Sequence, residues 1–155
     1  MRHPVRYILI LISFVGIASP ASGNSEGQYP YADVISVETE ERDGGFIFAV
    51  EVDSPDKGCN QYANWWEILT QDGKLIYRKI LSHSHTDEQP FIREGGPVVI
   101  HAGTEIIIRA HMHPGGYGGK VFKGSINGVL RQADLPPDFA SNVKSKPPFV
   151  DYCQW

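Results

Sequence analysis

The chain has 155 residues, a formal net charge of −4 at pH 7 and 41% hydrophobic residues. This length suits one domain with a single core. The acidic balance argues against nucleic acid or an anionic membrane surface as partners, because both select for basic patches.

The N-terminus predicts a secretory signal peptide. Arg2 and Arg6 flank a short basic start, a mostly apolar run covers residues 7–18, and the small residues SPASG follow. The run is shorter than the about 20 apolar residues that normally span a bilayer. We therefore expect residues 1–23 to be a signal peptide and residues 24–155 to be one exported domain, periplasmic or secreted; a retained membrane anchor is the alternative. No cysteine directly follows the apolar run, so a bacterial lipid anchor is not indicated.

The rest of the chain predicts strands. Short runs rich in β-branched and aromatic residues recur between Gly, Asp, Asn and Pro, without the apolar period of a helix. The runs cover residues 33–40, 46–52, 65–70, 75–81, 97–100, 104–113 and 121–126. The sequences RDGG and QDGK predict hairpin turns after the first and third runs. Only residues 136–143 suggest a helical turn, with Pro137 suited to its first turn.

About seven short antiparallel strands predict an all-β, Ig-like β-sandwich, with a small β-barrel as the alternative. Cys59 and Cys153 both lie in the exported part, where an even cysteine count predicts a disulfide. Two free buried thiols are the alternative. The bridge would close a loop of roughly 95 residues and stabilise the fold by about 4.5 kcal/mol on the loop-entropy model. It would also fasten the proline-containing C-terminal tail.

Four histidines form two H-x-H pairs, His83 with His85 and His111 with His113, each pair at the end of a predicted strand. Side chains alternate along a strand, so we expect the second pair to lie side by side on the face turned away from the core. Neutral imidazoles two residues apart can converge on one ion, and an all-nitrogen set favours copper or zinc. Glu88 would add a carboxylate ligand or an acceptor for an imidazole N–H.

The metal hypothesis requires the two pairs to meet. Because both pairs follow the carboxyl ends of strands, we expect runs 75–81 and 104–113 to be parallel or in facing sheets, and not hairpin partners. The alternative is that these histidines are hydrogen-bonded surface residues that stiffen the loop ends. His101, beside a turn, is expected to be a turn residue.

The segment HSHTDEQPFIREG resembles the first motif of the cupin family, with His83, His85, Glu88 and Gly95 at the matching positions. The resemblance implies a small metalloenzyme whose ion keeps an open coordination position. It covers about 25 residues. The gap from His85 to Glu88 is shorter than in the family, and only a glycine matches the second motif.

An aromatic cluster offers a different function. Tyr62, Trp65 and Trp66 follow Cys59, and adjacent tryptophans on a strand point to opposite faces. We expect one of them to be exposed and, with Tyr62 or an exposed Tyr117, to stack on a sugar or another ligand.

The loop PGGYGG lacks the Lys-Ser/Thr of a phosphate loop, and the chain has no G-x-S-x-G nucleophile motif. The sequence therefore favours a non-enzymatic, exported β-sandwich that binds copper or zinc. A carbohydrate- or ligand-binding module and a cupin-like metalloenzyme are the alternatives.

Overall fold

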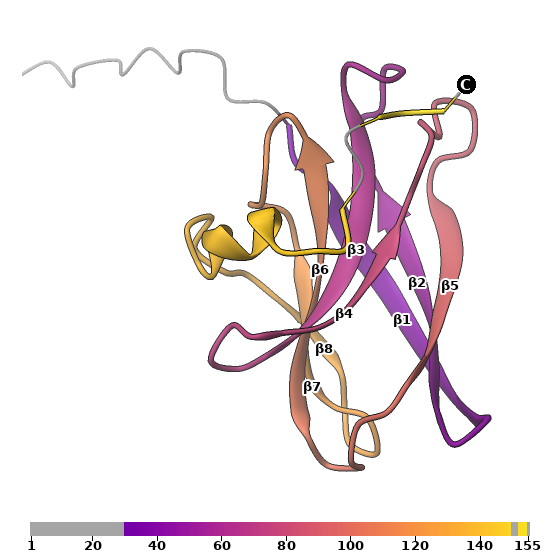
Figure 1. Ribbon diagram of the computed structural model, residues 1–155, viewed down its shortest axis with the longest axis vertical. Coiled ribbons are helices and arrows are strands. Elements are labelled where there is room, and N and C mark those ends of the chain that lie inside the picture. The colour runs from indigo at the N-terminus through magenta and orange to yellow at the C-terminus, as the bar shows by residue number, and fades with distance from the viewer. Residues whose placement is uncertain (1–29, 150–151, 155) are drawn as a thin grey trace, which may run out of the picture.

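The computed structural model describes residues 30–149 and 152–154, which form two antiparallel sheets packed face to face (Figure 1). The elements are β1 (Asp33–Arg42), β2 (Gly45–Asp53), β3 (Tyr62–Thr70), β4 (Leu75–Ile80), β5 (Phe91–Val98), β6 (Glu105–His113), β7 (Val121–Ser125), β8 (Arg131–Ala133) and the 3-10 helix η1 (Ser141–Ser145). The predicted all-β sandwich is confirmed. The predicted signal peptide lies outside the described residues. Within the described part, no helix is long and apolar enough to cross a membrane.

The smaller sheet has the order β1-β2-β5. Its first hairpin turns at Asp43 and Gly44, which both have positive φ (56° and 78°). This is the turn conformation that matches the twist of the flanking strands, so the prediction from RDGG is confirmed.

The larger sheet has the order β4-β3-β6-β7-β8. β3 pairs antiparallel with both β4 and β6, so β4 and β6 run parallel to each other on either side of it. In the constant-type Ig sandwich the fourth strand belongs to the sheet of the first, second and fifth strands. Here β4 pairs with β3 instead, which leaves three strands in one sheet and five in the other.

The main core lies between the two sheets. Its largest fully buried side chains include Phe48 of β2, Trp66 and Ile68 of β3, and Ile108 of β6. Alternate residues of each strand point into this core, as the alternation of apolar and polar residues predicts.

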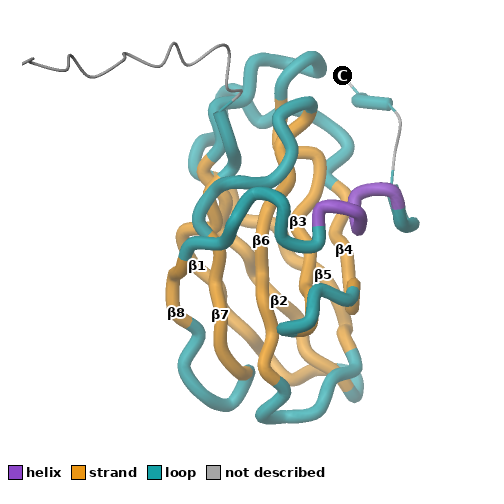
Figure 2. The backbone as a smooth tube through the Cα atoms, turned by 90° about the vertical axis from the view of Figure 1, so that its left-hand side faces the viewer, coloured by secondary structure: helices purple, strands orange, loops and turns teal. Residues whose placement is uncertain are grey.

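The outer face of the larger sheet is also covered. The chain after β8 returns across this face (Figure 2), and we call residues 136–149 with 152–154 the C-terminal segment. Leu69 of β3, Ile107 of β6 and Val121 of β7 are buried there against Val143 of η1. The histidine pair at positions 111 and 113 faces away from the core between the sheets, as expected, but this face is covered at His111, which is 7% exposed, and is open at His113.

The main differences from the sequence prediction concern β5, β8 and η1. β5 begins at Phe91 and not at residue 97, and it is an edge strand, where Pro97 can be accommodated. β8, a strand of three residues, carried too short a pattern to be recognised. The helical turn expected in residues 136–143 is η1, shifted towards the C-terminus.

Candidate functional site

Three charged side chains on the outer face of the larger sheet hold the C-terminal segment in place. Glu67 of β3 lies directly opposite Arg78 of β4 and Arg109 of β6 in the strand register. Its Oε2 accepts from Nε and Nη2 of Arg78 at 2.8 and 2.6 Å, and its Oε1 accepts from Nε of Arg109 at 2.8 Å. All three side chains are buried, so the two cations share one counter-charge away from water.

The remaining guanidinium donors bind backbone carbonyls of the C-terminal segment. Arg78 donates to the carbonyls of Val143, Lys146 and Pro148 at 2.7 to 2.9 Å. Arg109 donates to two further carbonyls, those of residues 139 and 140, at 2.6 and 3.1 Å. An irregular segment cannot form the regular backbone hydrogen bonds of a neighbouring strand. The bonds from Arg78 and Arg109 satisfy its carbonyls instead, which explains how the segment packs on the sheet without being a strand.

A stack of rings continues this arrangement along the sheet. Trp65 lies between the imidazole of His111, at a centroid distance of 3.9 Å, and the guanidinium of Arg78, 4.3 Å from its ring. Tyr117 meets His111 edge-on at 4.7 Å, and the guanidinium of Arg109 lies 3.5 Å from the Tyr117 ring. Both faces of the indole are thus covered.

His111 is buried and neutral at pH 7. Its Nδ1 donates to Oδ1 of Asn64 at 2.6 Å, which leaves Nε2 as the acceptor nitrogen of the ring. Burial, followed by the nearby positive charges of Arg78, Arg109 and Lys144, lowers its pKa to about 3.

A cavity of about 330 Å³ lies beside this stack. Its walls include Tyr62, Trp65 and His111 from the sheet, and Phe149 and Tyr152 from the C-terminal segment. Asn64, His113, Lys144 and the disulfide complete its lining. Phe149 and Tyr152 are 45% and 62% exposed, so their rings are available to a ligand. The volume is at the lower end of the range of small-molecule sites, about 300–1,000 Å³.

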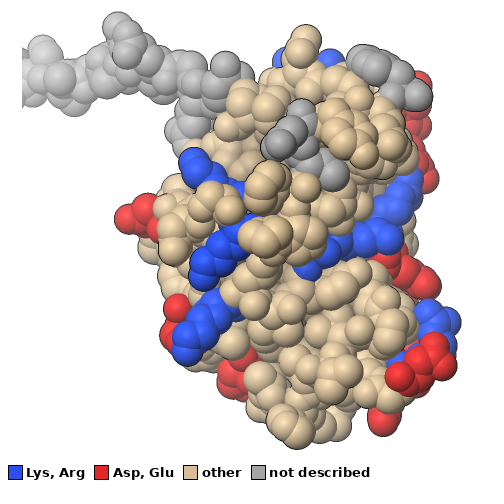
Figure 3. Space-filling model, in the orientation of Figure 1, with Lys and Arg blue, Asp and Glu red and all other residues tan. Residues whose placement is uncertain are grey.

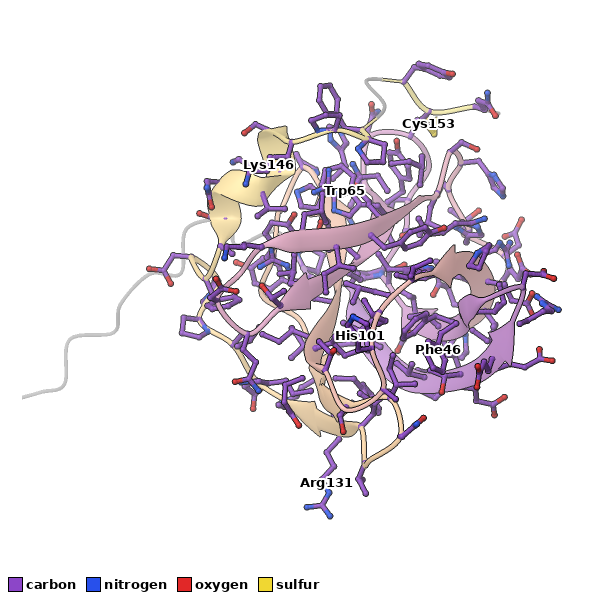
Figure 4. All side chains as sticks on the ribbon, turned by 60° about the horizontal axis from the view of Figure 1, so that its bottom comes forward. Phe46, Trp65, His101, Arg131, Lys146 and Cys153 are labelled. Carbon is purple, nitrogen blue, oxygen red and sulfur yellow. A yellow bond between two sulfur atoms is a disulfide. The ribbon has the colours of Figure 1, made fainter. Side chains whose placement is uncertain are left out.

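The disulfide between Cys59 and Cys153 is present, as predicted. It joins the loop before β3 to the end of the C-terminal segment, and Gln154 N donates to Ser82 O at 2.6 Å close by. The bridge therefore fixes the outer wall of the cavity. The sticks view shows Trp65, Lys146 and Cys153 on one side of the molecule, away from Arg131 (Figure 4).

A second polar cluster joins two loops by hydrogen bonds: the loop that precedes β3 and the loop that follows β4. Oδ1 of Asp56 accepts from Ser54 Oγ at 2.7 Å and from Ala63 N at 2.9 Å, while Oδ2 accepts from His85 N at 2.8 Å. Gln89 binds the same loops through Ser54 N and His85 O. This network fixes the H-x-H loop after β4.

His85 is buried within that loop. Its ring stacks on Phe91 at a centroid distance of 3.8 Å and lies 4.5 Å from the ring of His83. Neither ring nitrogen has a hydrogen-bond partner among the described residues, and Nδ1 is 3.9 Å from Oδ2 of Asp56. Burial, followed by the charge of Arg93, lowers the pKa of His85 to about 4.

The two H-x-H pairs lie at the same end of the larger sheet, because both follow the carboxyl ends of strands that flank β3 in parallel. They are not hairpin partners, as expected, and the strand between them in the sheet is β3. However, His85 packs toward the smaller sheet, whereas His111 lies on the outer face of the larger one. Among residues 30–149 and 152–154, no three His, Cys, Asp or Glu side chains are placed to hold one metal ion.

The expected exposure of several side chains is wrong. Trp65 and Tyr117 are only 4% and 6% exposed, because the C-terminal segment makes a third layer over the larger sheet. Trp66, 0% exposed, is the one of the two adjacent tryptophans that lies in the core between the sheets, as expected. Glu88 is exposed and pairs with Arg93 at 2.7 Å. His101 is exposed at a turn, as expected.

Sequence reasoning missed Glu67, Arg78 and Arg109. The available signal was the position of Glu67 and Arg109, each of which interrupts a run of apolar or aromatic residues in the middle of a predicted strand; Arg78 is followed by Lys79 and gave no such signal. A charged residue in the middle of an apolar strand is rarely fully buried unless it is paired with an opposite charge.

No protein-family model matches the chain, and no solved structure matches it. A protein of Halomicrobium mukohataei with the name "Putative lipoprotein" is 32% identical over 113 residues, which cover 70% of this chain. The chain spans 56% of the length of that relative. The name says nothing of a ligand, a reaction or a partner.

Proposed function

We propose that the protein is an exported, non-enzymatic binding domain that holds a small ligand in the cavity between the larger sheet and the C-terminal segment. The observation that carries this proposal is the composition of the cavity. It combines exposed ring faces (Phe149 and Tyr152) with an acceptor nitrogen on His111 and a nearby cation (Lys144). Apolar walls with a few placed polar groups are typical of small-molecule sites.

Export is supported by three observations. The N-terminal segment has the layout of a signal peptide, the fold contains a disulfide, and a relative carries the name of a lipoprotein. Disulfides persist in oxidising compartments, which agrees with a periplasmic or secreted protein.

The test is a titration with neutral and acidic mono- and disaccharides and with amino acids, followed by tryptophan fluorescence and thermal unfolding. A ligand that binds in the cavity is expected to raise the unfolding temperature, since it binds only the folded state. The Tyr152→Ala variant is expected to bind about fivefold more weakly, because an aromatic contact contributes about 1 kcal/mol.

The matched control is Val129→Ala, which also truncates an exposed apolar side chain (61% exposed) but is not among the residues that line the cavity. It is expected to bind normally. Equal binding by the Tyr152 and Val129 variants would contradict a site in this cavity.

Copper or zinc binding is the second candidate function, and the loop after β4 is the place for it. The rings of His83 and His85 are 4.5 Å apart, and both ring nitrogens of His85 lack a partner among the described residues. Two imidazoles would give weak binding that depends on further ligands from water. Titration of the metal-free protein with Cu²⁺ and with Zn²⁺ tests this candidate. A stoichiometric response that His83→Gln removes, and that the exposed control His101→Gln retains, would support it; the same response in both variants would not.

A further inference from the structure

The charge around the cavity selects among ligands. Lys144 is the one residue with a full formal charge among the described residues that line it, and none of those residues is acidic. The whole chain, in contrast, has a formal net charge of −4. In the space-filling view, Lys and Arg side chains form a band across the middle of the face that the C-terminal segment crosses (Figure 3). The described lining of the cavity therefore carries one positive charge, on Lys144, in a chain that is acidic as a whole.

The buried ions below the cavity add to this charge. Arg78 and Arg109 contribute two positive charges and Glu67 contributes one negative charge, so the cluster carries a net charge of +1. The imidazole of His111 already experiences this field, since both arginines and Lys144 contribute to the depression of its pKa after the effect of burial. Such a field favours an anion over a neutral ligand.

The polar atoms and rings of the cavity favour a sugar. His111 Nε2 is an acceptor for a hydroxyl, because Nδ1 is engaged by Asn64. The phenol of Tyr152 can donate and accept, and the exposed faces of Tyr152 and Phe149 suit the apolar face of a pyranose ring. A flat aromatic acid would use the rings and the cation but would leave the acceptor nitrogen unpaired.

We infer that the ligand is an acidic sugar, a uronate of one or two rings, with its carboxylate toward Lys144 and its ring against Phe149 and Tyr152. This inference rests on the proposed function and names the class of ligand for the same cavity.

The experiment compares three probes on the full mature chain. Galacturonate and its neutral methyl ester share the sugar ring and differ in charge, whereas benzoate has the carboxylate but no sugar ring. The Kd of each is measured from the shift of the Trp65 indole N–H resonance at low and high salt. Galacturonate is expected to bind about 1.4- to 5-fold tighter than the ester, because an exposed ion pair contributes about 0.2–1 kcal/mol. This preference should shrink with added salt. Lys144→Gln is expected to abolish it, whereas Arg131→Gln, which removes a cation on the far side, should keep it.

The outcomes separate the two proposals. Equal binding of the acid and the ester at Trp65 would overturn the requirement for an anion while leaving the cavity as a sugar site. Benzoate binding as tightly as galacturonate would overturn the requirement for a sugar. If these probes and the neutral panel all fail to move the Trp65 resonance, the proposed function itself is wrong.

Discussion

Replacement of Glu67 by glutamine tests how the outer face of the larger sheet is built. The side chain is fully buried, and its two oxygens accept from Arg78 and Arg109 at 2.6 to 2.8 Å. The Glu67→Gln variant keeps the shape but leaves two buried guanidinium charges without a counter-charge. Loss of one partner of a buried ion pair costs about 3–5 kcal/mol. The carbonyls of the C-terminal segment still accept from both arginines, so we expect the lower end, about 3 kcal/mol.

Urea unfolding at pH 7.5, followed by tryptophan fluorescence, measures this cost directly. A loss of about 3 kcal/mol corresponds to a fall in Tm of roughly 10 °C for a domain of this size. The matched control, Glu38→Gln on β1, makes the same change at an exposed position and is expected to alter the free energy of unfolding by less than about 0.5 kcal/mol. A loss below about 1 kcal/mol in Glu67→Gln would refute the role of this carboxylate as the shared counter-charge.

Three further predictions concern the histidines, the disulfide and the polar loop cluster. His85 and His111 are neutral in the folded protein with pKa values of about 4 and about 3, below the ordinary value of 6.5. Above pH 6.5 both imidazoles are neutral in the folded and the unfolded chain, so the free energy of unfolding keeps its full value. As the pH drops from 6.5 toward the folded-state pKa values, the free energy of unfolding should fall by up to about 1.4 kcal/mol per pH unit for each imidazole. A flat profile of urea midpoints between pH 7 and 5 would contradict this. Cys153→Ser, which removes the bridge to Cys59, is expected to lower the free energy of unfolding by up to about 4.5 kcal/mol, as measured by calorimetry. The variant is also expected to bind ligand more weakly in the titration. Unchanged affinity would show that the bridge does not help to form the cavity. Asp56→Asn is expected to cost about 2 kcal/mol, because a carboxylate that accepts from two backbone N–H groups becomes a neutral amide, and a cost near zero in the same urea assay would argue against the network.

Most of the strands, the first turn and the disulfide were predictable from sequence because their signals are local, whereas β8 and most of β5 were not predicted. Asp43-Gly44 favours a hairpin turn with positive φ independently of the rest of the chain, and alternation of apolar residues in β2 identifies the face of the core. The disulfide between Cys59 and Cys153 could be predicted from the even number of cysteines and the predicted oxidising compartment alone.

The candidate site was not predictable in the same way, because its defining feature is a contact between distant parts of the chain. Trp65 and His111 alternate with core residues, so a two-layer sandwich would expose them. They are buried because a segment without regular structure covers them, held by carbonyl bonds to Arg78 and Arg109 that no local pattern encodes. The expectation that β4 and β6 are parallel or in facing sheets left two arrangements open, of which the structure has the first, and the face on which each imidazole lies was not predicted.

The central claim is that a small ligand binds between the larger sheet and the C-terminal segment. The most direct measurement is the two-dimensional ¹H–¹⁵N spectrum of the mature protein during titration with galacturonate, read at the indole N–H groups of Trp65 and Trp66. Trp65 lines the cavity, whereas Trp66 is fully buried in the core between the sheets and serves as an internal control. We predict a saturable shift of the Trp65 resonance with the Trp66 resonance unchanged. Saturable shifts confined to the loops around His101 and Arg131, with Trp65 unmoved, would contradict the claim.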